Sequence, residues 1–309
     1  MSTISIENSS GTSLTADRIG RLAARALRLE VDTWPKPGLV SHRDSGSHTD
    51  MDAQMFYASA ETLRPFFAAL FQAGHMGCEM EDLRAIGRAA EASMLEVTGG
   101  VNTHRGAIFG LGLLSAAAGA MARVGLAAAP RSLGAWVRHR WGSAILSGPL
   151  SARSHGTEAL RRYGAGGARV EAAAGFPHVY QIGLPALRMA HLIGGNDENV
   201  ARVQACFALI AKVEDTNLLH RSGKEGLRFA QCAARSFLEN GGVGQMDWLS
   251  HAAKIHRTFI ARRLSPGGSA DLLAATLFVA SLESEQPAGT RLGHQPDERR
   301  WRRSCQPSF

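Results

Sequence analysis

The chain has 309 residues, of which 45% are hydrophobic and 20% charged, and its net charge at pH 7 is +7. This length and apolar content suffice for one large core or two modest ones. With only 6% aromatic residues, no basic stripe interleaved with aromatics, no long uninterrupted apolar run and no basic-then-apolar N-terminus, the sequence favours neither a nucleic-acid partner nor a membrane one. Four scattered cysteines without a CxxC pair are typical of a reduced, cytoplasmic protein.

The N-terminal part of the chain predicts a short tail followed by three helices. Residues 1–14 are polar and rich in Ser and Thr, and we expect them to be disordered. Thr15 can cap a helix whose apolar residues recur at helical spacing. Two further helices are expected at about 53–72 and 79–97.

Between the first two helices lies a loop, residues 34–52, that is unusually long and dense in charge for a helical protein. It reads WPKPGLVSHRDSGSHTDMD, and Pro35 and Pro37 exclude a continuous helix. Its ionisable residues are Lys36, His42, Arg43, Asp44, His48, Asp50 and Asp52. A loop held by a rigid scaffold commonly carries function, so we interpret it as part of a site. A solvated surface loop with incidental charge is the alternative.

The segment TGGVNTHRG, residues 98–106, predicts a glycine turn that opens the next helix. Asn102 or Thr103 can cap this helix, and its free N–H groups would suit phosphate, with Arg105 adding charge. It is not a P-loop, because no GK[ST] follows the glycines. An ordinary capped turn explains the pattern equally well. The helix that follows is rich in Gly and Ala, which predicts a central position with close neighbours.

The C-terminal half predicts further helices and no strand of convincing alternation. We expect a helix over 132–146, two short helices in the Gly-rich connector 148–177, and a helix capped by Asn196 or Asp197. The remaining helices are expected at 224–240 and 247–263, and after LSPGGSAD, with Ser269 as the last cap and an end near Glu283. The sequence therefore predicts a single compact all-α domain of roughly ten helices, residues 15–286, followed by a basic, disordered tail, residues 287–309.

One helix changes polarity along a single face. The apolar stripe that includes Val200, Phe207 and Ile210 continues, if the helix persists, onto Glu214, Asn217 and Arg221. Buried carboxylates are costly unless they are paired with a cation, a metal or a substrate. The stripe therefore predicts the wall of a site, with a purely structural Glu214–Arg221 pair as the alternative.

Several of these segments together resemble one family. The stretches WPKPGLVSHRDSGSHTDMD, TGGVNTHRGAIFGLGLL, SHG, GARVEAAAGFP, EDTNLLHRSG and LSPGGSADLLA look like the motif set of the triphosphoribosyl-dephospho-CoA synthases, in the family's order and over about residues 16–283. Many members associated with citrate lyase have an aspartate directly after PGLV, where this chain has Ser41. In this respect the chain is more similar to the branch associated with malonate decarboxylase.

The resemblance implies a reaction and its partners. ATP and 3′-dephospho-CoA would give 2′-(5″-triphosphoribosyl)-3′-dephospho-CoA and adenine, by attack of a ribose 2′-hydroxyl on the anomeric carbon of ATP. The product would pass to a phosphoribosyl-dephospho-CoA transferase that acts on an acyl carrier protein. An oxocarbenium-like transition state calls for a nearby carboxylate, a proton acceptor and cations for the triphosphate, with Mg²⁺ as the expected cofactor.

These needs can be matched to residues of the motifs. For the chemistry at the anomeric carbon we expect Glu214 and Asp215, with Glu171 in reserve. Asp44, Asp50 and Asp52 are the expected Mg²⁺ ligands, although Asp52 can instead cap the helix that begins near Ala53. The residues expected to bind substrate or phosphate are Lys36, His42, Arg43, Asn102, Arg105, Asn217, Arg221 and Lys224.

Two other functions remain open at this stage. A metal-dependent hydrolase of nucleotides or ADP-ribosyl groups would also use aspartates with Mg²⁺, but would not need dephospho-CoA. A non-catalytic helical module could bind RNA or an acyl carrier protein through a basic surface, although clustered acids are not typical of one. Among the histidines of the motifs we expect structural hydrogen bonds rather than zinc, because no paired spacing such as HExxH occurs.

Overall fold

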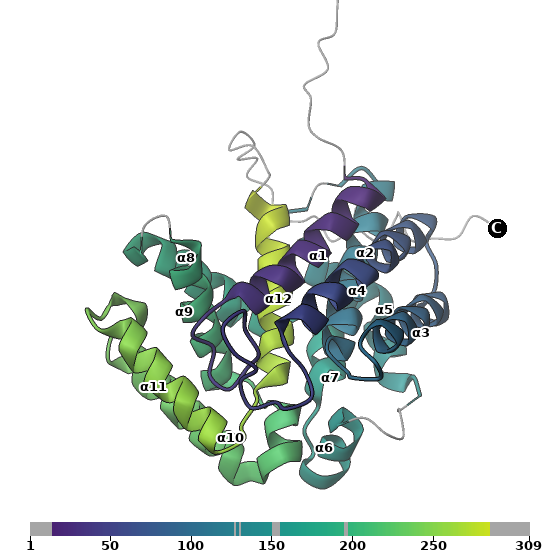
Figure 1. Ribbon diagram of the computed structural model, residues 1–309. Coiled ribbons are helices and arrows are strands. Elements are labelled where there is room, and N and C mark those ends of the chain that lie inside the picture. Colours follow the sequence, from purple (N-terminus) through teal and green to yellow (C-terminus); the bar gives the residue numbers. More distant parts are fainter. Residues whose placement is uncertain (1–13, 127, 130, 150–154, 195–196, 285–309) are drawn as a thin grey trace, which may run out of the picture.

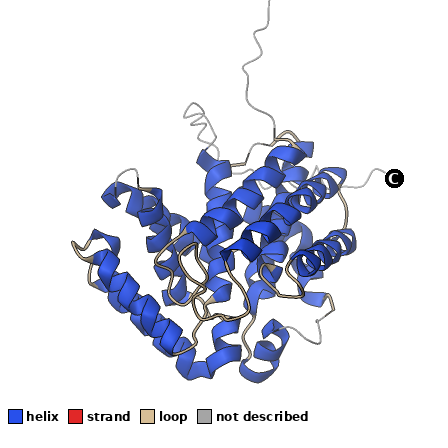
Figure 2. Cartoon of the chain, in the orientation of Figure 1, coloured by secondary structure: helices blue, strands red, loops and turns tan. Residues whose placement is uncertain are grey.

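The computed structural model describes residues 14–126, 128–129, 131–149, 155–194 and 197–284, and in these ranges it is helical without a strand (Figure 2). The all-α prediction is confirmed, with twelve α-helices where roughly ten were expected. They are α1 (Ala16–Asp32), α2 (Ala53–Met76), α3 (Met80–Val97), α4 (Arg105–Arg123), α5 (Ser132–Ser147), α6 (His155–Tyr163), α7 (Gly167–Ala173), α8 (Leu184–Gly194), α9 (Glu198–Lys212), α10 (Thr216–Glu239), α11 (Trp248–Ala261) and α12 (Gly267–Ser284). The predicted tails 1–14 and 287–309 lie outside the described residues, apart from Leu14.

Helix α4 occupies the centre predicted from its small residues, and α2 packs along it most extensively. A Cβ on Gly119 would lie 1.9 Å from the Phe71 carbonyl oxygen, so only glycine permits this approach of α2 and α4. Among the described helices α4 alone is long and apolar enough to cross a membrane, but 72% of that stretch is buried within the protein. Its hydrophobicity is therefore explained by its place in the core.

Helix α12 is the second buried helix, and it lies between α1 on one side and α9 on the other (Figure 1). It also packs against α4. Because α12 contacts α1 as well, the first and last described helices lie side by side. Six of its apolar side chains are fully buried or nearly so: Leu273, Ala274, Ala275, Phe278, Val279 and Leu282. The N-terminus of α12 is thereby fixed close to the N-terminus of α4.

Several predicted helix boundaries are confirmed and others are corrected. Thr15 caps α1 and Asp197 caps α9, as expected. Helix α9 ends at Lys212 instead of continuing through Glu214, and α10 begins at Thr216 with Asp215 as its cap. The predicted helix start at Gly223–Lys224 is a kink inside α10, where Gly223 adopts a φ of 62°. Helix α8 was not predicted.

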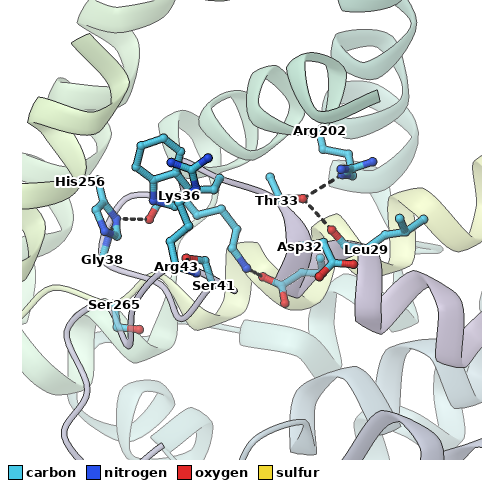
Figure 3. Close-up of polar contacts among 12 residues, drawn as sticks. Leu29, Asp32, Thr33, Lys36, Gly38, Ser41, Arg43, Arg202, His256 and Ser265 are labelled. Atoms are coloured by element: carbon cyan, nitrogen blue, oxygen red, sulfur yellow. Dashed lines mark hydrogen bonds and ion pairs between the residues drawn. The ribbon is translucent and has the colours of Figure 1, made fainter. Parts of the chain in front are cut away.

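The loop 34–52 is fastened to residues far along the chain. Gly38 has a φ of 68°, and a Cβ there would lie 2.0 Å from the Leu264 carbonyl oxygen. The Ser47 hydroxyl donates to the same carbonyl at 2.6 Å. His256 on α11 contacts the Lys36 carbonyl through Nδ1 at 2.6 Å (Figure 3). These contacts hold the loop against α11 and the turn before α12.

Candidate active site

A cavity of about 880 Å³ opens where the N-termini of several helices converge. Its wall is formed by parts of the loop 34–52, the start of α4, helix α7, the turn 213–217 and the start of α12. Its volume is within the range typical of small-molecule sites.

Asp215 joins two of these helix N-termini. Its Oδ1 accepts from the backbone N–H groups of Asn217 at 3.0 Å and Leu218 at 3.3 Å, and so caps α10. Its Oδ2 accepts from the backbone N–H and the hydroxyl of Ser269 at 2.8 and 3.0 Å. Ser269 is therefore a donor to Asp215 and not itself the predicted cap of α12. Burial raises the pKa of Asp215, although these four hydrogen bonds oppose the rise.

Asp271, the fifth residue of α12, also lines the cavity and was not among the predicted site residues. A Cβ on Gly106 would lie 2.0 Å from its Oδ2, so the carboxyl group rests against the first turn of α4. Burial raises its pKa well above the ordinary value, and the negative charges of Glu30 and Asp215 add to the rise. The Ala107 N–H bond partly opposes it. Its place in the motif LSPGGSAD was the only sequence signal.

Glu30 and Lys36 form a buried ion pair. Lys36 is completely buried and is not among the cavity-lining residues, whereas Glu30 is. The predicted contact between Lys36 and a triphosphate therefore needs correction, because the ammonium group is already paired. Burial raises the pKa of Glu30 and the charge of Lys36 lowers it. The charge of Lys36 thus stabilises the carboxylate form of Glu30 at the cavity wall.

Glu171 lines the cavity from α7. Its carboxylate accepts from the backbone N–H of His178 at 2.8 Å and contacts Nδ1 of the same residue at 2.7 Å. The hydrogen bond to Glu171 raises the pKa of His178. Both residues line the cavity, so Glu171 is placed as predicted, with a histidine partner that the sequence did not indicate.

Glu214 does not point inward from a helix as predicted. Because α9 ends at Lys212, Glu214 lies in the following turn and is exposed, whereas its neighbour Asp215 is only 1% exposed. Glu214 still lines the cavity, but at an exposed position. No Glu214–Arg221 ion pair was found in the described part of the chain. The expected roles of the two adjacent acids are therefore corrected: Asp215 is the buried one.

The cations of the wall differ in their partners. Arg105 is paired with Glu91, its Nε lying 2.6 Å from that carboxylate, while Asn102 accepts from the Arg105 backbone N–H. Arg221 is held by neutral acceptors: the carbonyls of Ser47 and Arg263 at 3.4 and 3.5 Å, and His48 Nδ1 at 3.2 Å. The charge of Arg221 is therefore free for an anion, whereas that of Arg105 is already compensated.

Arg169, like Arg221, is a cation held by neutral acceptors. Its guanidinium donates to four carbonyl oxygens at and beyond the end of α5, at distances between 2.5 and 3.1 Å. It lines the cavity, and its neutral partners leave its charge uncompensated. With Arg221 it gives the cavity two fixed positive groups.

Other predicted binding residues lie away from the cavity or at its edge. Arg43 stacks over the Trp34 ring at 4.3 Å, and Lys224 lies 6.0 Å from the centre of the Tyr163 ring. His42 is exposed. None of these three residues lines the cavity. Asn217 does line it, as predicted.

The three aspartates of the loop are separated by their contacts. Asp52 caps α2, accepting from the Met55 N–H at 3.0 Å. Asp44 contacts His256 Nε2 at 3.1 Å and does not line the cavity. Asp50 alone of the three lines it, 3.6 Å from His48. In the described ranges no three His, Cys, Asp or Glu side chains come together as a metal site, so this set does not fit a preformed three-aspartate cage.

Comparison with known proteins places the chain among enzymes of one kind. Residues 16–290 match the model of the CitG family, described as ATP:dephospho-CoA triphosphoribosyl transferase. A protein of Stutzerimonas stutzeri, named a probable 2-(5″-triphosphoribosyl)-3′-dephosphocoenzyme-A synthase, is 43% identical over 86% of this chain and 92% of its own length. Relatives of the same name are 44% identical in Azotobacter vinelandii, over 87% and 92%, and 41% identical in Pseudomonas aeruginosa, over 84% and 89%. No solved structure matches the chain.

Proposed function

Because this chain belongs to the CitG family of ATP:dephospho-CoA triphosphoribosyl transferases, we propose that it transfers the triphosphoribosyl group of ATP to 3′-dephospho-CoA. The ribose 2′-hydroxyl attacks the anomeric carbon of ATP, and adenine leaves with the electron pair of its glycosidic bond. The observation that supports this most is that the matched stretch, residues 16–290, contains every segment that lines the cavity.

The triphosphate fits the parts of the cavity wall that hold Arg221 and Arg169. Both guanidinium groups are fixed by neutral acceptors, so a phosphate can bind them without first breaking an ion pair. Arg105 would have to leave Glu91 to do the same. We therefore place the phosphate contacts on Arg221 and Arg169 first, with Asn102 and Asn217 as neutral donors nearby.

The anomeric carbon fits the side where Glu30, Asp215 and Asp271 lie close enough to raise the pKa of Asp271. Asp215 is held by four donors and is suited to stabilise positive charge on the ribose without moving. Asp271 lines the cavity beside Gly106, and because its pKa is raised it is the acid of this group most suited to accept the proton of the 2′-hydroxyl. Glu171 with His178 is the second candidate for that proton.

Mg²⁺ enters this proposal with the nucleotide. In nucleotide sites it keeps several waters and is usually held by the phosphates and one or two carboxylates, so no preformed cage is needed. Asp50 is the loop aspartate that reaches the cavity and can hold one of those waters. When bound, the ion would offset charge on the triphosphate.

The pathway is a further part of the proposal. The loop sequence SHRDSGSHTDMD, with Ser41 after PGLV, favours the malonate decarboxylase branch over that of citrate lyase. The product would then serve a phosphoribosyl-dephospho-CoA transferase that modifies the acyl carrier protein of that enzyme. To test this, the labelled product is given to such a transferase together with the carrier protein of malonate decarboxylase or that of citrate lyase. Label found only on the citrate lyase carrier would contradict this assignment.

The reaction is tested by incubating the purified protein with ATP, Mg²⁺ and 3′-dephospho-CoA. We expect adenine and the triphosphoribosyl adduct in equal amounts, detected by chromatography and mass spectrometry. Leaving out dephospho-CoA should stop adenine release, because the acceptor hydroxyl is then missing. Equal adenine release without dephospho-CoA would identify a nucleotide hydrolase instead, and absence of adenine with both substrates would refute the proposed function.

A further inference from the structure

His104, the residue before α4, carries a buried polar atom for which the described protein offers no partner. The residue is only 3% exposed, and it forms part of the cavity wall. Its Nδ1 lies 2.7 Å from the Ser59 hydroxyl, but its Nε2 has no hydrogen-bond partner within the described residues. Leaving a buried donor or acceptor unsatisfied is costly, so such an atom calls for an explanation.

The neighbouring hydroxyl groups determine which nitrogen of His104 carries the proton. Thr103 Oγ1 donates to Ser59 Oγ at 2.9 Å. The Ser59 oxygen therefore accepts one proton, and we infer that its own proton goes to His104 Nδ1. An imidazole nitrogen that accepts a hydrogen bond carries no proton in the neutral ring, so the proton lies on Nε2. His104 is thus a donor whose tautomer is fixed from behind by two hydroxyls.

The ring is also held neutral. Burial and the nearby charge of Lys36 lower the pKa of His104 to about 3, so it carries no charge in neutral solution. A neutral N–H group binds a phosphate less strongly than the guanidinium groups of Arg221 and Arg169, which the wall already provides. It is suited to an uncharged acceptor. The Phe56 ring stands edge-on to the imidazole at 4.9 Å and lines the same wall, giving that acceptor an aromatic neighbour.

From these contacts we propose that the Nε2–H of His104 donates a hydrogen bond to N3 or N7 of the adenine of ATP. This rests on the proposed function. As the bond from C1′ to N9 breaks, its electron pair moves onto the purine, while the 2′-oxygen bonds to C1′ and its proton passes to a carboxylate. The purine nitrogens become stronger acceptors during this step, so the hydrogen bond strengthens toward the transition state. His104 transfers no proton itself.

Two substitutions at His104 separate the role of the Nε2–H donor from that of the Nδ1 contact with Ser59. In His104→Asn the shorter amide can still reach Ser59 but no longer extends to the position of Nε2. In His104→Gln the amide nitrogen can reach that position. Each variant and the parent enzyme are compared on ATP, 3-deaza-ATP and 7-deaza-ATP with saturating dephospho-CoA, by the kcat/KM for release of the base. Intrinsic differences between the leaving groups cancel when the same analogue is compared across enzymes.

For each analogue, the preference is the ratio of kcat/KM for ATP to kcat/KM for the analogue. For at least one analogue we expect this ratio to be at least about tenfold larger in the parent than in His104→Asn, the size typical of a lost neutral hydrogen bond in a buried site. His104→Gln should recover part of that preference. An unchanged preference in His104→Asn for both analogues would overturn the proposal. So would ¹⁵N spectra of the parent showing the His104 proton on Nδ1.

A binding measurement keeps this inference separate from the proposed function. Calorimetry with ATP and the same deaza analogues, without dephospho-CoA, needs no turnover. If the parent releases no adenine yet binds ATP more tightly than an analogue, and His104→Asn loses that difference, the proposed reaction fails while the contact to the base stands. Thermal melts of both variants check that the fold is retained. Equal affinities of the folded parent for ATP and both analogues, together with equal turnover, would contradict the contact.

Discussion

The loop 34–52 and the junction formed by residues 213–217 and 265–271 face the same cavity but use their charges differently. In the loop, Lys36 is paired with Glu30, Asp44 contacts His256, and Asp52 caps α2. In the junction, the buried Asp215 and the half-buried Asp271 both line the cavity. The loop has the greater density of charge in the sequence, yet most of that charge holds the fold together.

This contrast shows that a charged residue in a motif does not by itself indicate a ligand contact. Whether the charged group can bind a ligand depends on the partner that it already has in the fold. A buried ion pair such as Glu30–Lys36 is already satisfied, so it supports the site without taking part in it. A carboxyl group at a helix N-terminus, surrounded by N–H donors and by other acids, is held in place while its charge or proton remains available. The four predictions that follow test this contrast.

The largest effect is expected from removing the cation of the buried pair. Lys36→Met leaves the Glu30 carboxylate buried without a partner, and we expect the free energy of unfolding to fall by about 3–5 kcal/mol. Urea unfolding measures this. Arg43→Gln, in the same loop but stacked on the surface of Trp34, is the matched control and should cost less than about 1 kcal/mol. Similar losses in the two variants would remove the distinction between buried and exposed loop cations.

The next largest effect concerns Asp271. Asp271→Asn removes the proton-exchanging group, and we expect adenine release to fall by at least about 100-fold, the usual contribution of a general base. The fold should be retained, because the substitution takes a carboxyl group away from two neighbouring acids. Turnover and a thermal melt are measured together. If Asp271→Asn turns over near the parental rate while Glu171→Gln does not, the proton passes to the Glu171–His178 pair instead.

Two loop aspartates give a smaller, paired test. Asp50→Asn should raise the Mg²⁺ concentration needed for half-maximal activity by roughly tenfold, within the range for loss of an outer-shell partner of a metal. Asp44→Asn should leave it nearly unchanged, because Asp44 faces His256 and not the cavity. Both are read from activity as Mg²⁺ is titrated. A larger shift for Asp44→Asn than for Asp50→Asn would reverse our assignment.

The smallest effect is expected at Asp52. Asp52→Ala removes the cap of α2 and should lower the free energy of unfolding by about 1 kcal/mol, with kcat/KM unchanged. Asp52→Ser keeps a capping oxygen and should recover most of that stability. A drop in kcat/KM for both variants without a loss of stability would restore the metal role first expected from the sequence.

The sequence predicted the fold better than the site. Helical spacing and caps such as Thr15 and Asp197 are local signals, and the structure agrees with them. The wrong boundary lay at residues 212–216, where the apolar stripe continues into a turn and periodicity alone cannot reveal that the helix has ended. The connection between Asp215 and Ser269 spans 54 residues, and no local pattern reports it.

The candidate site could be predicted as a set of segments but not as a set of roles. Many of the segments lining the cavity lie in or beside the recognised motifs, whereas helix α3 lines it with Met80, Leu83 and Glu91 and belongs to no motif. Asp271 was overlooked because a single aspartate after a glycine turn resembles an ordinary first-turn acid. His178 was overlooked because nothing in the sequence links it to Glu171 except a seven-residue spacing.

The fastening of the loop 34–52 has a consequence for synthesis. Its partners His256, Leu264 and Ser265 follow it by 212 to 220 residues. On the ribosome, about the first two hundred residues therefore emerge, and helices α1 to α4 can pack, before these distant partners of the loop exist. The cavity is complete only once α12 has been synthesised, because Gly268, Asp271 and Ala275 of that helix line it. A chain that stalls before α12 therefore lacks one wall of the cavity and the Ser269 donor to Asp215.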